Sequence, residues 1–102
     1  MEELKRELDV SDHVYIRLLP QKRSLANISL KTKILRLNRD FVGMLSRDEL
    51  RFVLAHELLH IKYGNVHSLK MRHELLNLFR EETMSSTMKK AERFFRLQTT
   101  KD

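Results

Sequence analysis

Two histidines four residues apart, with a glutamate next to the first, are the residues of this chain best suited to do chemistry. They are His56, Glu57 and His60, in the segment HELLH. On a helix, residues i and i+4 lie on the same face one turn apart, so both imidazoles can bind one metal ion. The neighbouring carboxylate can accept a proton from a water molecule that zinc has acidified. The pattern predicts a zinc-dependent hydrolytic site, with His56 and His60 as ligands and Glu57 as catalytic base.

The motif needs a helix around it, and the flanking residues predict one over residues 47 to 63. Ser46 and Glu49 have the spacing of a capping box, and Gly64 is a typical helix stop because glycine adopts left-handed conformations easily. Apolar residues surround the predicted axis instead of forming one stripe, which is typical of a buried helix. Histidines and a carboxylate on a buried helix need partners, and a metal ion supplies one.

A catalytic zinc site needs a third protein ligand, which must come from elsewhere in the chain. If a second helix begins near Ser68 and packs back against the first, a rise of about 1.5 Å per residue places Glu74 level with the histidine pair. Glu74 is therefore predicted as the third ligand. Three other residues stay open as alternatives: Glu81, Glu82 and His67. The spacing from His60 to His67 is one residue longer than in the three-histidine motif of metzincin peptidases.

Composition limits the classes of function. The chain has 102 residues and no cysteine, which excludes a disulfide framework and a thiolate zinc site. Its 20 Lys and Arg outnumber 14 Asp and Glu, but both signs are interspersed, so a solvated surface is favoured over nucleic-acid binding. The N-terminus is charged, without the apolar core of a signal peptide, and no apolar run is long enough to span a membrane. We therefore expect one cytoplasmic domain over residues 1–102.

The rest of the chain predicts an α+β fold. Strand-forming segments precede the motif, and two further helices are expected after Gly64, separated by a break. The expected strands lie within residues 13–19, 25–30 and 31–38. The second helix is expected from Ser68 into the low eighties, and the break at residues 83–86, before a third helix.

Three segments around the HELLH motif are similar to a known group of enzymes. They are ILRLNRDF at 34–41, LSRDEL at 45–50 and VLAHELLHIKYG at 53–64. Together they resemble the catalytic core of gluzincin metallopeptidases, and most closely the soluble minigluzincins, which are related to CAAX prenyl proteases and HtpX-like membrane peptidases. The resemblance implies a minimal zincin fold: a small sheet of two or three strands with an active-site helix, a glutamate helix and a C-terminal helix.

The resemblance also implies a function. It implies a zinc-dependent metalloendopeptidase that acts on peptides or unfolded proteins and holds one Zn²⁺ with His56, His60 and Glu74. The substrate would add as a strand to an edge of the sheet, for which residues 34–37 are expected. Minigluzincins resemble zymogens whose cleft is blocked in a homodimer, so the segment after Phe95 is expected to restrain activity. The alternatives are a SprT-like DNA-associated zinc protease with His67 as third ligand, and a non-catalytic zinc-binding interaction module.

Overall fold

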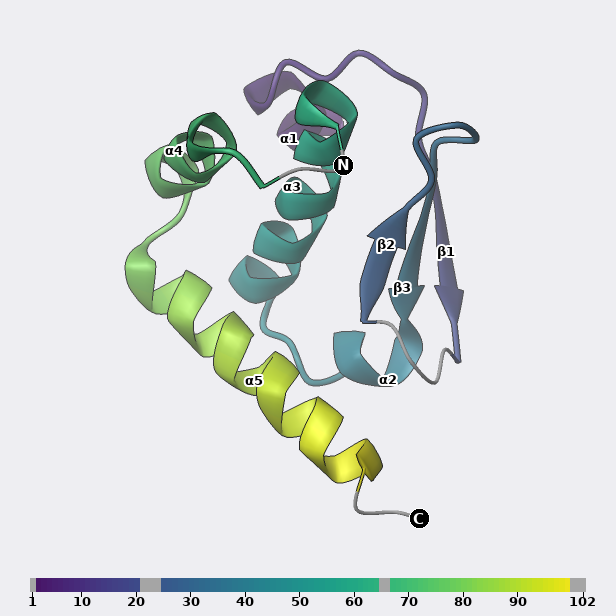
Figure 1. Cartoon of the computed structure of the whole chain (residues 1–102), viewed down its shortest axis with the longest axis vertical. Coiled ribbons are helices and arrows are strands. Elements are labelled where there is room, and N and C mark those ends of the chain that lie inside the picture. The colour runs from purple at the N-terminus through teal and green to yellow at the C-terminus, as the bar shows by residue number, and fades with distance from the viewer. Residues whose placement is uncertain (1, 21–24, 65–66, 100–102) are drawn as a thin grey trace.

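The computed structural model describes residues 2–20, 25–64 and 67–99, with the backbone alone for residues 2 and 95–99. Five helices and three strands make up the described chain. In chain order they are α1 (Glu2–Glu7), β1 (Tyr15–Leu19), β2 (Ala26–Ile28), β3 (Ile34–Asn38), α2 (Arg39–Val42), α3 (Arg47–Tyr63), α4 (Leu69–Leu78) and α5 (Glu81–Thr99). Helix α3 lies between the sheet and α5, and α2 lies at one end of the sheet (Figure 1). The predicted α+β class is confirmed.

The sheet has the strand order β1-β3-β2. β3 pairs in parallel with β1, where Tyr15 lies opposite Ile34, and antiparallel with β2, where Ala26 lies opposite Leu37. The prediction that residues 34–37 form the substrate edge is therefore wrong, because β3 has a neighbour on both sides. The edge strand nearest α3 is β2 (Figure 1).

Helix α3 has the predicted bounds because its two ends are encoded locally. The Ser46 hydroxyl accepts a hydrogen bond from the Glu49 backbone N–H at 3.2 Å, and the Glu49 carboxylate accepts one from the Ser46 N–H at 2.8 Å. At the other end, Gly64 has φ of 78° and its N–H donates to the His60 carbonyl. Leu58 and Leu59 are fully buried between the sheet and the other helices, which fixes α3 as the centre of the core.

The predicted break at residues 83–86 is wrong, because α5 runs through it. Chain reversal occurs earlier, at Phe79, where α4 ends and the Phe79 ring packs edge-on against Phe52 with centroids 5.6 Å apart. Within α5 the hydroxyl of Thr87 donates to the Thr83 carbonyl at 2.6 Å, so these polar residues are satisfied inside a helix. Consequently α4 is short and stays near the C-terminal end of α3, and α5 runs back along α3 (Figure 1).

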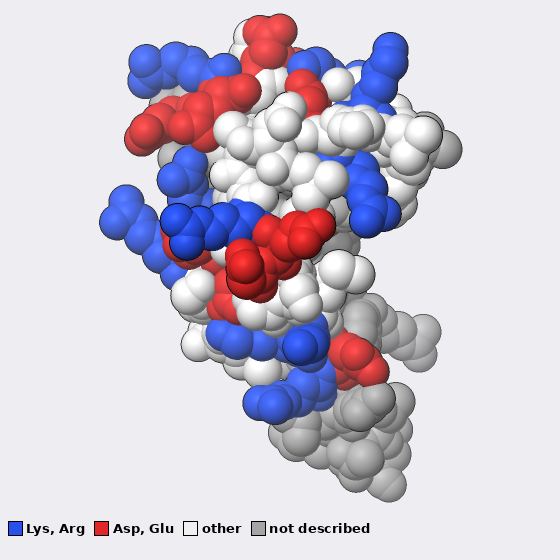
Figure 2. Space-filling view, turned by 90° about the vertical axis from the view of Figure 1, so that its left-hand side faces the viewer, with Lys and Arg blue, Asp and Glu red and all other residues white. Residues whose placement is uncertain are grey.

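Basic and acidic side chains are interspersed on the face formed by α4 and α5, as Figure 2 shows. This distribution agrees with the mixed charge pattern of the sequence, in which Lys and Arg are spread among Asp and Glu. None of the helices in the described ranges is long and apolar enough to cross a membrane. The charges on the face in Figure 2 therefore offer no specific support for a nucleic-acid partner.

Candidate active site

Three histidines lie close together: His56, His60 and His67. His56 and His60 project from α3, and His67 lies just before α4. One ligand atom from each lies within 4.8 Å of the other two. The His67 ring stacks on His56 with centroids 5.1 Å apart and lies edge-on to His60 at 4.9 Å. Ligand nitrogens about 2.0–2.1 Å from a tetrahedral zinc ion stand roughly 3.4 Å apart, so small side-chain rotations would fit this group to the ion.

The carbonyl of Gly64 orients His60. His60 Nδ1 lies 2.8 Å from the Gly64 oxygen. Because a carbonyl only accepts, Nδ1 must carry the proton, which leaves Nε2 with its lone pair for a metal. Gly64 holds its oxygen there with φ of 78° and ψ of −164°, a conformation essentially restricted to glycine. The same glycine thus ends the helix and selects the histidine tautomer suited to metal binding.

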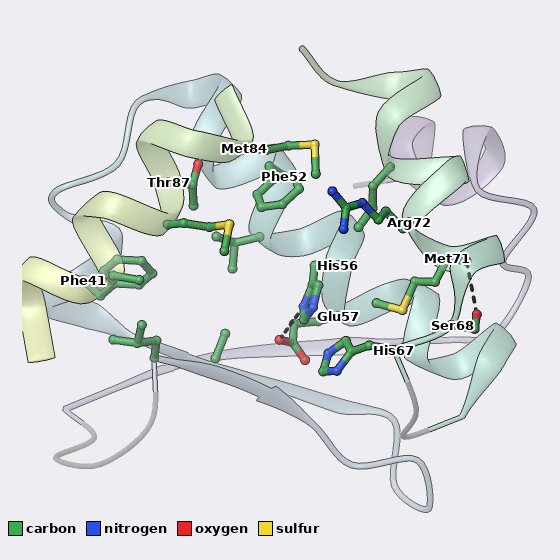
Figure 3. A pocket seen from close by; sticks show the side chains of 16 residues that line it. Phe41, Phe52, His56, Glu57, His67, Ser68, Met71, Arg72, Met84 and Thr87 are labelled. Carbon is green, nitrogen blue, oxygen red and sulfur yellow. Dashed lines mark hydrogen bonds and ion pairs between the residues drawn. The ribbon is translucent and has the colours of Figure 1, made fainter. Parts of the chain in front are cut away.

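Glu57 is a buried carboxylate beside the histidines. The residue is 7% exposed, and its Oε1 lies 3.2 Å from His56 Nδ1. When Glu57 is ionised it can only accept, so His56 donates from Nδ1 and keeps Nε2 free, as His60 does. Figure 3 shows Glu57 next to His56 and His67 in the lining of a cavity. A carboxylate in this position can exchange a proton with a molecule bound between it and the histidines.

Glu74 lies away from the histidines. Its Oε1 accepts a hydrogen bond from Lys62 Nζ at 2.7 Å, and in the described chain the compact metal-binding group contains His67 and not Glu74. The predicted height of Glu74 assumed that one helix returns along α3. Because α4 instead stays near the end of α3 and buries Met71 and Leu75, Glu74 meets the last turn of α3.

The other carboxylates left open by the sequence do not join the histidines either. Glu81 and Glu82 are exposed in the first turn of α5. Of the alternatives, His67 alone is brought to the pair. Its spacing from His60 is one residue longer than in the metzincin motif, but the described chain returns to the histidine pair at His67 despite the extra residue. The signal available in the sequence was the presence of a third histidine shortly after the predicted helix stop at Gly64.

An apolar cavity of about 700 Å³ opens next to the histidines. Leu25 and Ala26, at the start of β2, and Met84 and Met88 of α5 are among its lining residues. His56, Glu57 and His67 belong to the same lining. The candidate metal site therefore borders a cavity large enough for part of a peptide.

A buried carboxylate fastens the α5 wall of this cavity to α3. Glu49 accepts hydrogen bonds from Lys90 at 2.5 Å and from the Ser86 hydroxyl at 2.6 Å, and Lys90 also donates to the Met44 carbonyl at 2.9 Å. Burial alone would raise the pKa of Glu49, but the hydrogen bonds from Lys90, Ser46 and Ser86 outweigh it and lower the pKa from 4.5 to about 2. The Glu49 carboxylate therefore caps the N-terminus of α3 and also holds α5 against α3.

Comparison with known proteins shows where the chain belongs. The model of peptidase family M48 matches residues 2–99. The chain belongs to peptidase family M48. It is 45% identical over 76 residues to the uncharacterized protein MJ1213 of Methanocaldococcus jannaschii, covering 72% of this chain and 69% of that protein. It is 38% identical over 90 residues to the uncharacterized protein aq_aa15 of Aquifex aeolicus, covering 88% and 82%.

Two solved structures resemble this M48 chain. The metallopeptidase zymogen jannalysin of Methanocaldococcus jannaschii superposes with a TM-score of 0.78 at 29% identity, over 92% of this chain and 91% of that one. The metallopeptidase zymogen abylysin of Pyrococcus abyssi superposes with a TM-score of 0.73 at 27% identity, over 93% and 88%. The predicted kinship with minimal metallopeptidases is confirmed, and so is the metallopeptidase function at the level of the family.

Proposed function

We propose that this chain is a zinc-dependent endopeptidase that holds one Zn²⁺ with His56, His60 and His67. The observation that carries the proposal is the three-histidine group beside buried Glu57, at the wall of an apolar cavity. When bound, zinc would acidify a water molecule and polarise the carbonyl of the scissile peptide bond. Glu57 takes a proton from the attacking water and passes it to the leaving amine.

The proposal replaces Glu74 with His67 as third ligand. Two contacts support the change: His67 lies against both motif histidines, whereas Glu74 forms an ion pair with Lys62. A DNA-associated zinc protease would share this ligand set, but the mixed charges in Figure 2 give it no specific support. The buried carboxylate of Glu57 favours an enzyme over a purely structural zinc module.

The substrate backbone is proposed to add to β2. This strand lies at one edge of the three-stranded sheet. Its first residue, Ala26, and the preceding Leu25 line the same cavity as His56 and Glu57. An extended peptide bound to a strand edge gains affinity from main-chain hydrogen bonds, which depend little on sequence. Side-chain preference must therefore come from the cavity.

We also propose that the chain is latent and homodimeric, with the segment after Phe95 restraining activity. The descriptions of jannalysin and abylysin as zymogens support latency. A chain truncated after Phe95 keeps Phe94, whose buried ring packs on Phe41 with centroids 5.7 Å apart. Compared with the full chain at equal zinc, the truncated chain should cleave peptides faster. Equal rates would count against latency of this kind.

The catalytic proposal is tested by zinc-dependent cleavage of an unfolded protein such as casein, using wild type and Glu57→Gln. Both proteins should bind zinc, because Glu57 is not a ligand. Loss of the base should lower the rate by about 10²–10⁴-fold. Cleavage by Glu57→Gln at the wild-type rate would show that the site is not the one proposed.

A further inference from the structure

Strand β1 is an open edge of the sheet. It pairs with β3 on one side, and in the described chain no other strand pairs with its outer side. The Tyr15 N–H donates to the Lys33 carbonyl at 3.0 Å, so the main chain of Tyr15 points toward β3. Because main-chain groups alternate in direction along a strand, the N–H and C=O groups of Ile16 and Leu18 point outward. Figure 1 shows this edge on the far side of the sheet from α5.

The side chains along this edge are apolar and uncovered. Tyr15, Ile16 and Leu18 are 58%, 42% and 54% exposed. Ile16 lies opposite Leu35 of β3, which is fully buried, and β1 therefore directs Ile16 toward the core face of the sheet. Leu18 lies opposite Leu37, which is buried as well. Helix α3 packs against β2, however, whereas β1 packs mainly against β3, so these inward-facing side chains stay in water.

The strand carries few of the features that keep edges apart. Natural edge strands are usually protected by several charges, a proline or a bulge. Within β1 the one charged residue is Arg17, and Pro20 comes only after the strand has ended. Unpaired main-chain groups therefore lie beside uncovered apolar side chains, and a further strand would satisfy both at once.

The sequence of β1 limits how two copies of it could pair in antiparallel fashion. Outward-pointing residues must face one another, so the two-fold axis passes beside a residue and not between two. An axis beside either of the last two residues uses Pro20, which has no N–H to donate. An axis beside Arg17 places two arginines directly opposite, which is repulsive. An axis beside Tyr15 leaves Leu18 opposite the carboxylate of Asp12.

The remaining axis, beside Ile16, gives complementary pairs. Ile16 then faces its own copy, and Leu18 faces Val14 of the second copy. These apolar pairs extend the core face of the sheet, where Val14 already packs against the core. On the opposite face, Arg17 meets the Tyr15 ring of the second copy, and a guanidinium is attracted to an aromatic face. Each pair of outward-pointing residues exchanges two main-chain hydrogen bonds, about six in all.

We infer that β1 is a self-association surface, at which two copies of the chain join antiparallel into one sheet of order β2-β3-β1-β1-β3-β2. The inference goes beyond the proposed peptidase function, because it needs neither zinc nor cleavage, and it does not involve the segment after Phe95. Both copies keep β2 as an open edge, so the proposed substrate edge stays accessible. The interface is small and the association weak, and salt strengthens it because each copy carries a net charge of +6.

Single cysteines test the register, because the chain has none of its own. In Ile16→Cys the two new residues lie directly opposite, with Cα atoms about 5.5 Å apart, which a disulfide can span. In Leu18→Cys they lie four positions apart along the paired strands, roughly 14 Å, which it cannot. Under mild oxidation of the full chain, Ile16→Cys should form covalent dimers at least about tenfold faster than Leu18→Cys or than Leu76→Cys, an exposed position on α4.

Sedimentation velocity of the full chain between about 5 and about 500 µM measures the dimer without cross-linking. Wild type should change from monomer toward dimer as its concentration rises. Ile16→Lys places two lysines face to face and should weaken association at least about tenfold. Leu76→Lys is the matched control, since Leu76 is 37% exposed on α4, and it should leave association unchanged. Circular dichroism verifies that both variants are folded.

Three results would overturn the inference. A chain that is monomeric at every concentration would leave β1 as an edge for an extended segment of another protein. A dimer that survives in folded Ile16→Lys would place the interface elsewhere. Equal cross-linking of Ile16→Cys and Leu18→Cys would show a contact without a fixed register, and this comparison decides even if Ile16→Lys does not fold. None of these results bears on zinc-dependent cleavage, which tests the proposed function separately.

Discussion

Replacing Glu49 with glutamine should loosen the α5 wall and remove a pH dependence of stability. The pKa of Glu49 falls from 4.5 to about 2 because the hydrogen bonds from Lys90, Ser46 and Ser86 outweigh its burial. At about 1.36 kcal/mol per pH unit, this difference corresponds to at most about 3 kcal/mol of folding free energy. Since the folded pKa is the lower one, this stabilisation is present above about pH 4.5 and is lost as pH falls toward about 2.

Urea unfolding followed by circular dichroism measures the effect. Near neutral pH, Glu49→Gln should lower the free energy of unfolding by about 1–3 kcal/mol, because Lys90 loses its charged partner in a buried network. The loss should shrink steadily between about pH 4.5 and about pH 2. Glu82→Gln is the matched control: this exposed carboxylate on α5 should change stability by less than about 0.5 kcal/mol. A Glu49→Gln loss that stays constant down to about pH 2 would refute the reasoning.

Two further substitutions test how local structure supports the site. Gly64→Ala should destabilise the fold by about 1–3 kcal/mol, because alanine is strained in the backbone conformation of Gly64. It should also weaken zinc binding by about 10–100-fold, because the carbonyl that orients His60 moves. Chelator competition measures the zinc affinity, and Gly43→Ala, at an ordinary helical φ, is the control. Unchanged zinc affinity in Gly64→Ala would dismiss the orienting role. Asn38→Ala should cost about 1–2 kcal/mol in thermal unfolding, because the Asn38 side chain accepts from the N–H groups of Asp40 and Phe41 at the start of α2.

The parts of the fold that could be predicted are those encoded by neighbouring residues. The capping box of Ser46 and Glu49 and the stop at Gly64 defined α3 fully, because both ends depend on contacts within four residues. The three strands were visible as extended apolar segments. Their order was not, because the pairing of β3 with both neighbours joins residues far apart in sequence.

The parts that could not be predicted depend on tertiary contacts. The Thr83 to Ser86 segment resembles a helix break, but Ser86 donates to the buried carboxylate of Glu49, a partner 37 residues away. The actual break at Phe79 is set by packing on Phe52. The position of Glu74 depends on a tertiary contact as well: α4 begins where predicted, but it stays near the C-terminal end of α3 instead of returning along it, so Glu74 meets Lys62 and not the histidines.

The ligand set is the central claim, and zinc content tests it most directly. Wild type, His67→Ala and Glu74→Ala should be loaded with equal zinc, passed through a desalting column and analysed by mass spectrometry for metal per chain, with affinity from chelator competition. Wild type and Glu74→Ala should each retain one zinc ion with similar affinity. His67→Ala should weaken zinc binding by more than the factor of about 10–100 that is typical when a residue that only hydrogen-bonds to a metal ligand is replaced. Zinc retained by His67→Ala and lost from Glu74→Ala would contradict the account.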